Sequence, residues 1–339
     1  MNIEIVEDKQ SWDDFFTNSS IETSFFQSFN WGRFQEKIGN QILRIRFTDK
    51  ERIVGQALGV IINAKRGKYL YVRNGPAMFW DNYEQASEIL SLLKNLAREK
   101  GLWFIRISPL LELDSPKARI LESFDFSVSH MHDVDALDTW ILSLEQTEEE
   151  ILQGMRKSTR YEIRKAERNG VEIIKTRDSA YIDAFYEIYK NTIERQNWTG
   201  YSKIFLKKQF EIFSEDGSAL LYLSKYKEKF ISGSIFIYYG DSSYYHYSGS
   251  LTEFKKIPST SLIHWENIKE AKSRGLKKYN FWGISPDDKP NHPWYGLTFF
   301  KKGFGGYEKR WMKTRDIEIS PLYKLTRIIE RIDKWKKGY

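Results

Sequence analysis

The sequence predicts an α/β (α+β) protein of two tandem domains, each with a mixed, mostly antiparallel sheet. Length is the first reason, because 339 residues exceed one ordinary compact core. The second is composition, since 41% hydrophobic and 29% charged residues are typical of a globular protein. The third is repetition, because one order of helices and strands occurs twice, before and after a region near residue 145.

The first half is expected to open with a strand and two helices, at Ile3–Val6, Trp12–Phe16 and Trp31–Lys37. Strand-like runs of residues then predict three strands, at Gln41–Phe47, Ile53–Ile62 and Tyr69–Val72. A run with apolar residues three and four apart predicts a helix that stops at a glycine. This helix and the three elements after it are expected at Glu84–Lys100, Trp103–Ile107 (strand), Lys117–Ser123 (helix) and from Phe124 (strand).

The second half repeats this order. A strand, two helices, three strands, a helix and a strand are expected at Val171–Lys175, Tyr181–Arg195, Lys203–Phe213, Ala219–Tyr226, Phe230–Tyr239, Ser243–Ser250, Ser259–Arg274 and Lys278–Trp282. This is the element order of N-acyltransferase (GNAT-like) domains. We therefore expect two GNAT-like domains, residues 1–145 and 146–312, that arose by duplication.

The C-terminal segment, residues 313–339, ends in a basic amphipathic helix whose apolar residues recur at helical spacing. We expect this segment to pack back on the first domain. A helix that lies on a membrane surface is the alternative, because Lys and Arg residues stand between the apolar ones.

Composition excludes several classes of site. The chain has no cysteine, which excludes a cysteine nucleophile, a thiolate zinc site and disulfides. Its five histidines lack metal-ligand spacing, so no metal is expected. The N-terminus does not resemble a signal peptide, and no apolar run approaches the ~18–20 residues that span a bilayer. We expect a cytoplasmic monomer, with contact to the inner face of the membrane as a further expectation.

The net charge of +7 favours polyanionic partners, although many basic proteins bind no nucleic acid. The basic residues gather between residues 149 and 170, where arginines four apart would stack along one helical face. This candidate RNA-binding ridge consists of Arg156, Lys157, Arg160, Arg164, Lys165 and Arg168. A solvated charged face is the alternative.

Two further groups carry candidate chemistry. Arg33 follows an aromatic cluster at a predicted helix start, where it is suited to hold a phosphate unless it is simply a surface arginine. Lys301 and Lys302 fall in an expected aromatic, glycine-rich turn between Gly296 and Gly306. A desolvated lysine there would stabilise an oxyanion, whereas a solvated pair would have no such role.

The motifs that the sequence lacks narrow the choice of acyl donor. There is no Gly-x-Ser-x-Gly, P-loop or His-Glu-x-x-His motif. There is also no Arg/Gln-x-x-Gly-x-Gly/Ala turn, which acetyl-CoA-dependent GNAT enzymes use to hold pyrophosphate. The fold is therefore expected to serve another acyl donor, or none.

Five segments, in this order and spacing, give the chain a resemblance to the Fem family of non-ribosomal peptidyltransferases. They are Phe26-Gln27-Ser28-Phe29-Asn30-Trp31, Asn74-Gly75-Pro76, Arg160 to Ala166 with Gly170-Val171, Tyr247-Ser248-Gly249-Ser250, and Gly296-Leu297 followed by Phe300-Lys301-x-Gly303-Phe304. The long coiled-coil insertion of some members is absent, because the span from Arg195 to Ala219 is too short to hold it. The architecture thus resembles that of FemX.

The resemblance implies an enzyme without a cofactor that transfers an amino acid from aminoacyl-tRNA to the stem-peptide amine of a peptidoglycan precursor, UDP-MurNAc-pentapeptide or lipid II. Lys301, after Phe300, matches the lysine at the reacting carbonyl, and Arg33 matches a diphosphate-binding position. Thr199 and Tyr247 match polar residues that line the acceptor pocket, and the resemblance implies that Tyr201 also binds the acceptor.

The chain departs from the family pattern at three acceptor-side positions. Tyr201 stands in place of an arginine, Phe205 in place of a tyrosine and Ser108 in place of an acidic residue. Two other functions stay open at this stage. One is a GNAT-fold N-acyltransferase that acts on another amine or uses another donor, and the other is an RNA- or lipid-binding module without catalysis.

Overall fold

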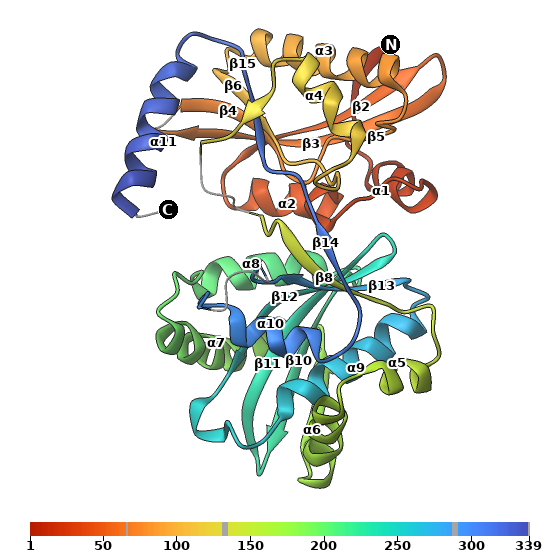
Figure 1. The fold of residues 1–339 in the computed structure, drawn as a ribbon, viewed down its shortest axis with the longest axis vertical. Coiled ribbons are helices and arrows are strands. Elements are labelled where there is room, and N and C mark those ends of the chain that lie inside the picture. The colour runs from red at the N-terminus through yellow and green to blue at the C-terminus, as the bar shows by residue number, and fades with distance from the viewer. Residues whose placement is uncertain (66, 131–134, 287–290, 338–339) are drawn as a thin grey trace. The chain divides into compact units, whose positions relative to one another are not determined.

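The structure is a computed structural model that describes residues 1–65, 67–130, 135–286 and 291–337. It contains two compact units (Figure 1). The first unit comprises residues 1–137 and 310–339, and the second comprises residues 138–309. The chain therefore leaves the first unit once and returns to it. The units divide earlier than the expected residue 145, because strand β8 (Asp138–Ser143) pairs with strand β13 (Lys278–Gly283) of the second sheet.

The described part of the first unit holds an eight-stranded sheet of order β1-β2-β3-β4-β6-β15-β7, with β5 paired to β3. Its strands are β1 (Asn2–Ile5), β2 (Gln41–Asp49), β3 (Arg52–Ala64), β4 (Gly67–Val72), β5 (Ala77–Met78), β6 (Phe104–Ile107), β7 (Ser127–Val128) and β15 (Arg315–Glu318). Its α-helices are α1 (Lys9–Asn18), α2 (Phe29–Lys37), α3 (Tyr83–Glu99), α4 (Arg119–Ser123) and α11 (Tyr323–Lys337). Short 3-10 turns lie at Phe25–Gln27 and Pro116–Ala118.

The described part of the second unit holds a seven-stranded sheet of order β14-β8-β13-β12-β11-β10-β9. Besides β8, its strands are β9 (Glu172–Thr176), β10 (Ala219–Tyr226), β11 (Lys229–Tyr239), β12 (Ser242–Ser250), β13 (Lys278–Gly283) and β14 (Tyr307–Arg310). Its α-helices are α5 (Glu148–Gly154), α6 (Lys157–Arg168), α7 (Ile182–Gln196), α8 (Lys203–Ser214), α9 (Ser259–Ser273) and α10 (Tyr295–Lys302). The 3-10 turns are Ser179–Tyr181 and Thr252–Phe254.

The two units share one topology. Apart from the two-residue strand β5, the order strand, two helices, three strands, helix and strand runs from β1 to β6 in the first unit and from β9 to β13 in the second. In each sheet the three central strands are antiparallel, and the strand after the long helix pairs in parallel with the last of them, as β4 with β6 and β12 with β13. The predicted fold class is therefore confirmed.

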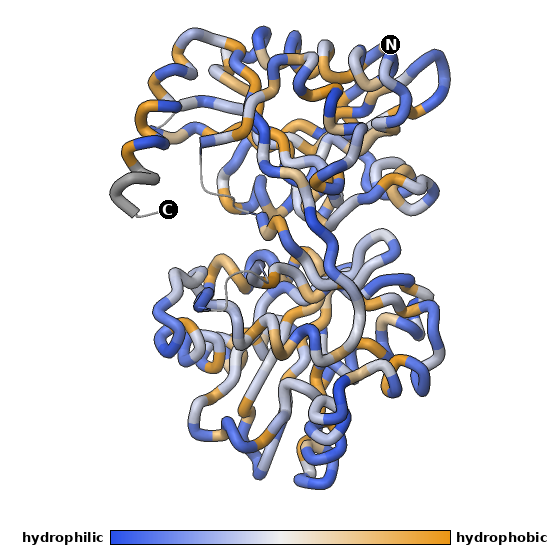
Figure 2. Tube along the Cα trace, viewed as in Figure 1, coloured by the Kyte–Doolittle hydropathy of each residue, from blue (hydrophilic) through white to orange (hydrophobic). Residues whose placement is uncertain are grey.

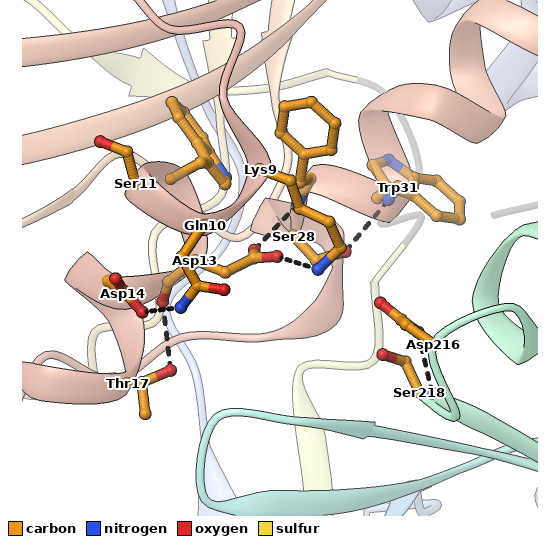
Figure 3. Close-up of polar contacts among 12 residues, drawn as sticks. Lys9, Gln10, Ser11, Asp13, Asp14, Thr17, Ser28, Trp31, Asp216 and Ser218 are labelled. Carbon is orange, nitrogen blue, oxygen red and sulfur yellow. Dashed lines mark hydrogen bonds and ion pairs between the residues drawn. The ribbon is translucent and has the colours of Figure 1, made fainter.

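Local capping fixes the start of α2, the helix that carries Arg33. The Ser28 hydroxyl accepts a hydrogen bond from the Trp31 backbone amide at 3.0 Å, as an N-cap serine does. Asp13 of α1 accepts a second one from the Phe29 amide at 3.1 Å and pairs with Lys9 at 2.6 Å (Figure 3). The first turn of α2 is thus tied to α1.

Candidate active site around Lys301

Lys301 lies in the last turn of helix α10. The glycine-rich turn that the sequence predicted at this place is therefore wrong. Residues 295–302 form a helix because Thr298 and Lys301, three apart, share its buried face. The Thr298 hydroxyl accepts a hydrogen bond from the Ser285 amide at 2.7 Å, which ties the helix to the segment after β13. Gly296 lies in the first turn of the helix, and the other glycines follow its last residue, where Gly305 and Gly306 have positive φ.

The Lys301 side chain is buried, with 3% of its surface exposed. Its Nζ atom donates a hydrogen bond to the Gly283 carbonyl oxygen, at the end of β13, at 2.5 Å. Burial lowers the pKa of Lys301 to about 7, because a desolvated ammonium is disfavoured. A lysine with this pKa can carry its charge to a developing oxyanion and can exchange a proton near neutral pH.

A fully buried histidine, His264 of α9, lies close enough to Lys301 for the two groups to interact electrostatically. Its Nδ1 atom is hydrogen-bonded to the Tyr279 hydroxyl at 2.5 Å. Burial, and secondly the charge of Lys301, lower the pKa of His264 to about 3, so the ring is neutral. Phe300, the residue before Lys301, packs edge-on against the His264 ring at 5.3 Å. Sequence patterns did not single out His264.

Lys302 points to a different environment. It is half-buried, and its Nζ atom lies 5.1 Å from the centre of the Trp140 ring. The two neighbouring lysines, which composition could not separate, therefore differ in burial and in contacts.

An aromatic cluster contains Tyr201 and Tyr247, two of the three residues that the resemblance assigns to the acceptor pocket. The Tyr201 ring stacks on Phe205 at 4.4 Å and meets Tyr247 edge-on at 5.6 Å. The Tyr247 hydroxyl donates to Gln209 Oε1 at 3.1 Å, which fixes the ring. Tyr201 remains 48% exposed, and Thr199 is exposed in the preceding loop. The cluster offers stacking and a hydroxyl where the family pattern has a charged arginine.

The predicted RNA-binding ridge is interrupted at its start. Arg156 precedes α6, and its guanidinium covers the Phe299 ring at 3.7 Å and donates to the Phe299 carbonyl at 3.2 Å, so it contacts helix α10 instead. Arg160 Nη1 donates to the carbonyls of Leu152, Gln153 and Met155 at the end of α5. Lys157, Arg164 and Arg168 are exposed.

The first unit contains a polar cluster that sequence reasoning missed. The Asp135 carboxylate accepts hydrogen bonds from Arg73 Nε at 2.7 Å, the Tyr71 hydroxyl at 3.2 Å and the Ser108 hydroxyl at 3.1 Å. An acidic group thus lies beside Ser108, the position where the family pattern has an acidic side chain. In the sequence, this cluster is indicated only by the position of Arg73, which directly precedes the Asn74-Gly75-Pro76 segment. Arg33 is half-buried on α2 of the same unit.

The described part of the chain contains neither a cluster of metal ligands nor a membrane-spanning helix. Within the described ranges, no three His, Asp or Glu side chains are grouped so that they would hold a metal ion. None of the described helices combines the length and the apolarity needed to cross a membrane.

The similarities to known proteins all indicate one family. The FemAB family model matches residues 8–131, 126–230 and 222–331. The lipid II:glycine glycyltransferase of Staphylococcus epidermidis is 21% identical over 396 aligned residues that cover 95% of each chain. The Staphylococcus aureus protein of that name is 20% identical over 389 residues, 92% of each chain.

Solved structures show the same fold. The crystal structure of FemX superimposes with a TM-score of 0.87 at 19% identity, covering 97% of this chain and 100% of that one. A tandem GNAT protein from the clavulanic acid biosynthesis pathway gives 0.57 at 11% identity, covering 94% and 99%.

The doubled GNAT-like fold places the chain among the tandem GNAT-fold proteins. The family matches extend over nearly the whole chain. The protein belongs to the FemAB family and is a transferase, which confirms the resemblance found in the sequence.

Proposed function

We propose that this protein transfers an amino acid from aminoacyl-tRNA to the stem-peptide amine of a peptidoglycan precursor, either UDP-MurNAc-pentapeptide or lipid II. The observation that carries the proposal is the buried Lys301 with a pKa lowered to about 7. The names of the staphylococcal relatives support lipid II as acceptor. Because aminoacyl-tRNA is a cytoplasmic molecule, the reaction would take place in the cytoplasm.

The reaction begins with attack of the neutral acceptor amine on the ester carbonyl carbon of the aminoacyl-tRNA. A C–N bond forms, and the carbonyl oxygen takes up negative charge, which the Lys301 ammonium stabilises. Such a contact typically contributes a few kcal/mol. The bond to the tRNA ribose oxygen then breaks, the amine loses a proton and the ribose oxygen gains one. The ester is already activated, so the step needs no cofactor.

The other proposed residues bind and orient the substrates. Lys157 and Arg164 are exposed on α6, where they can contact tRNA phosphates. Arg156 and Arg160, also expected on this ridge, act through their contacts with α10 and α5. For the acceptor, Tyr201, Tyr247 and Thr199 would contact the stem peptide, and Arg33 would bind the diphosphate.

The direct test supplies purified protein with tRNA charged with a radiolabelled amino acid and with either acceptor. Transfer of label to lipid II or to UDP-MurNAc-pentapeptide supports the proposal. A parallel reaction with acyl-CoA tests the alternative donor. Label transfer from acyl-CoA alone would refute the proposed donor, and tRNA binding without transfer would refute the enzymatic role. Mass spectrometry of muropeptides from cells with and without the gene identifies the added residue.

A further inference from the structure

Helix α11 is attached to the first unit by polar side chains. Glu330 is 3% exposed and pairs with the fully buried Arg106 of β6 at 3.0 Å. Arg106 also pairs with Asp316 of β15 at 2.7 Å, and the Tyr323 hydroxyl donates to Asp316 at 2.9 Å. Thr326 is fully buried on the same side of the helix. Besides the Tyr323 ring, which packs on Phe104, the docked face of α11 therefore carries groups that a solvated helix would normally turn to water.

Four apolar residues of α11 and of the turn before it face outward, with about half of their surface exposed: Leu322 45%, Leu325 49%, Ile328 55% and Ile332 46%. Tyr323 of the same helix is buried, and Ile329 is half-buried. At about 100° per residue, Leu325, Ile328 and Ile332 fall on one side of the helix, opposite to Tyr323, Thr326 and Glu330, whereas Leu322 lies in the turn before the helix. Figure 2 shows the resulting mixture of apolar and hydrophilic positions along α11. An amphipathic helix of a globular domain normally has the opposite arrangement, so this exposed row calls for a partner.

The charge of the helix identifies the kind of partner. The sequence of α11 contains six basic and two acidic residues. One of the acidic residues, Glu330, is paired internally with Arg106. Lys324 and Arg331 are exposed on the side next to the apolar row. An apolar row with adjacent basic residues is typical of a helix that lies in the interface of an anionic bilayer. A twofold contact between two copies would bring the basic sides together, which is unfavourable.

We propose that α11 docks this protein on the surface of an anionic lipid bilayer, with Leu322, Leu325, Ile328 and Ile332 inserted among the lipids and Lys324 and Arg331 beside the headgroups. The inference goes beyond the transfer reaction and does not rest on the identity of its donor or acceptor.

Co-sedimentation of the full chain with vesicles tests the docking. Vesicles of phosphatidylcholine with phosphatidylglycerol are compared with vesicles of phosphatidylcholine alone. The triple variant Leu325→Gln/Ile328→Gln/Ile332→Gln is expected to lower the partition coefficient at least tenfold. The matched control Ile5→Gln/Ile53→Gln/Leu113→Gln alters three other exposed apolar residues of the first unit and should bind as the wild type does.

The charge contribution is measured separately with Lys324→Gln/Arg331→Gln. Each charge removed should lower binding to the anionic vesicles by about fivefold, with little effect on the neutral ones. All variants should keep the wild-type free energy of unfolding in urea, which shows that they are folded and separates this test from that of the transfer reaction.

Three results would overturn the proposal. They are failure of the wild type to bind anionic vesicles, wild-type binding by the triple variant, and a wild-type dimer in light scattering that the triple variant converts to a monomer. The last result would assign the exposed row to a contact between copies.

Discussion

The Nζ atom of Lys301 donates a hydrogen bond to the main-chain carbonyl oxygen of Gly283 at 2.5 Å. The bond joins the last turn of α10 to the end of β13, so the amine is held by rigid elements on both sides. Because Lys301 is also desolvated, its charge is available at a fixed place and is weakly screened. The first two predictions follow from this contact.

Lys301→Met removes the amine and keeps an unbranched side chain. We expect the rate constant of transfer from bound aminoacyl-tRNA to fall on the order of 10²–10³-fold, as loss of one oxyanion donor does. Acceptor affinity should change little, since the amine contacts a main-chain carbonyl. Single-turnover kinetics measure the first effect and equilibrium binding the second. Lys302→Met is the matched control, and wild-type turnover in Lys301→Met would refute the assigned role.

The pH dependence of catalysis distinguishes the two protonation states of Lys301. Burial lowers its pKa to about 7, so the ammonium form is lost as pH rises through this value. The ratio of wild-type to Lys301→Met rate constants cancels the ionisation of the acceptor amine. If the ammonium acts, this ratio falls by up to tenfold per unit above about pH 7. A ratio that instead rises through pH 7 would make neutral Lys301 a general base.

Arg160 and Arg164 are expected to differ although both belong to the predicted RNA-binding ridge. Arg160→Ala removes the guanidinium that donates to three carbonyls at the end of α5 and should lower the free energy of unfolding by about 1–3 kcal/mol. Arg164→Ala should leave stability unchanged, weaken tRNA binding and lower the salt slope of log K by about 1. Urea unfolding and filter binding at several salt concentrations measure the two effects, and the reverse pattern would contradict the structure.

Tyr201→Ala tests the aromatic cluster on the acceptor side. The substitution removes the ring stacked on Phe205 and touching Tyr247. We expect KM for the acceptor to rise about tenfold, since one stacking contact contributes roughly 0.5–1.5 kcal/mol beyond area burial, while kcat changes little. Tyr307→Ala, which alters a tyrosine of similar exposure on β14, is the control. Unchanged acceptor kinetics in Tyr201→Ala would remove this residue from the pocket.

Arg106→Met tests how α11 is attached to the first unit. It leaves Asp316 and Glu330 buried without their cation, which should cost about 3–5 kcal/mol of folding free energy. Glu330→Gln keeps a hydrogen-bonding side chain and should cost less. Denaturant unfolding measures both effects. An Arg106→Met protein as stable as the wild type would show that the ion pairs do not stabilise the attachment of α11 to the first unit.

The order of elements could be predicted from the sequence because periodicity, glycine stops and helix caps are local signals. The helix expected at Glu84–Lys100 is α3 at Tyr83–Glu99, and the strand expected at Lys278–Trp282 is β13 at Lys278–Gly283. Helix α10 was missed because its glycines suggested a turn, whereas contacts of Thr298 and Lys301 with distant segments stabilise a helix.

The sequence by itself determined the doubled GNAT-like fold, the family and the chemical type of the residues at the candidate site. Only the tertiary structure decided which charged residues are buried. Lys301 is desolvated beside Gly283, Arg160 bonds to the end of α5, and Arg106 pairs with Glu330 across 224 residues of chain. The physical reason is that desolvation and ion pairing depend on neighbours from distant parts of the chain, whereas helix and strand patterns are recorded in consecutive residues.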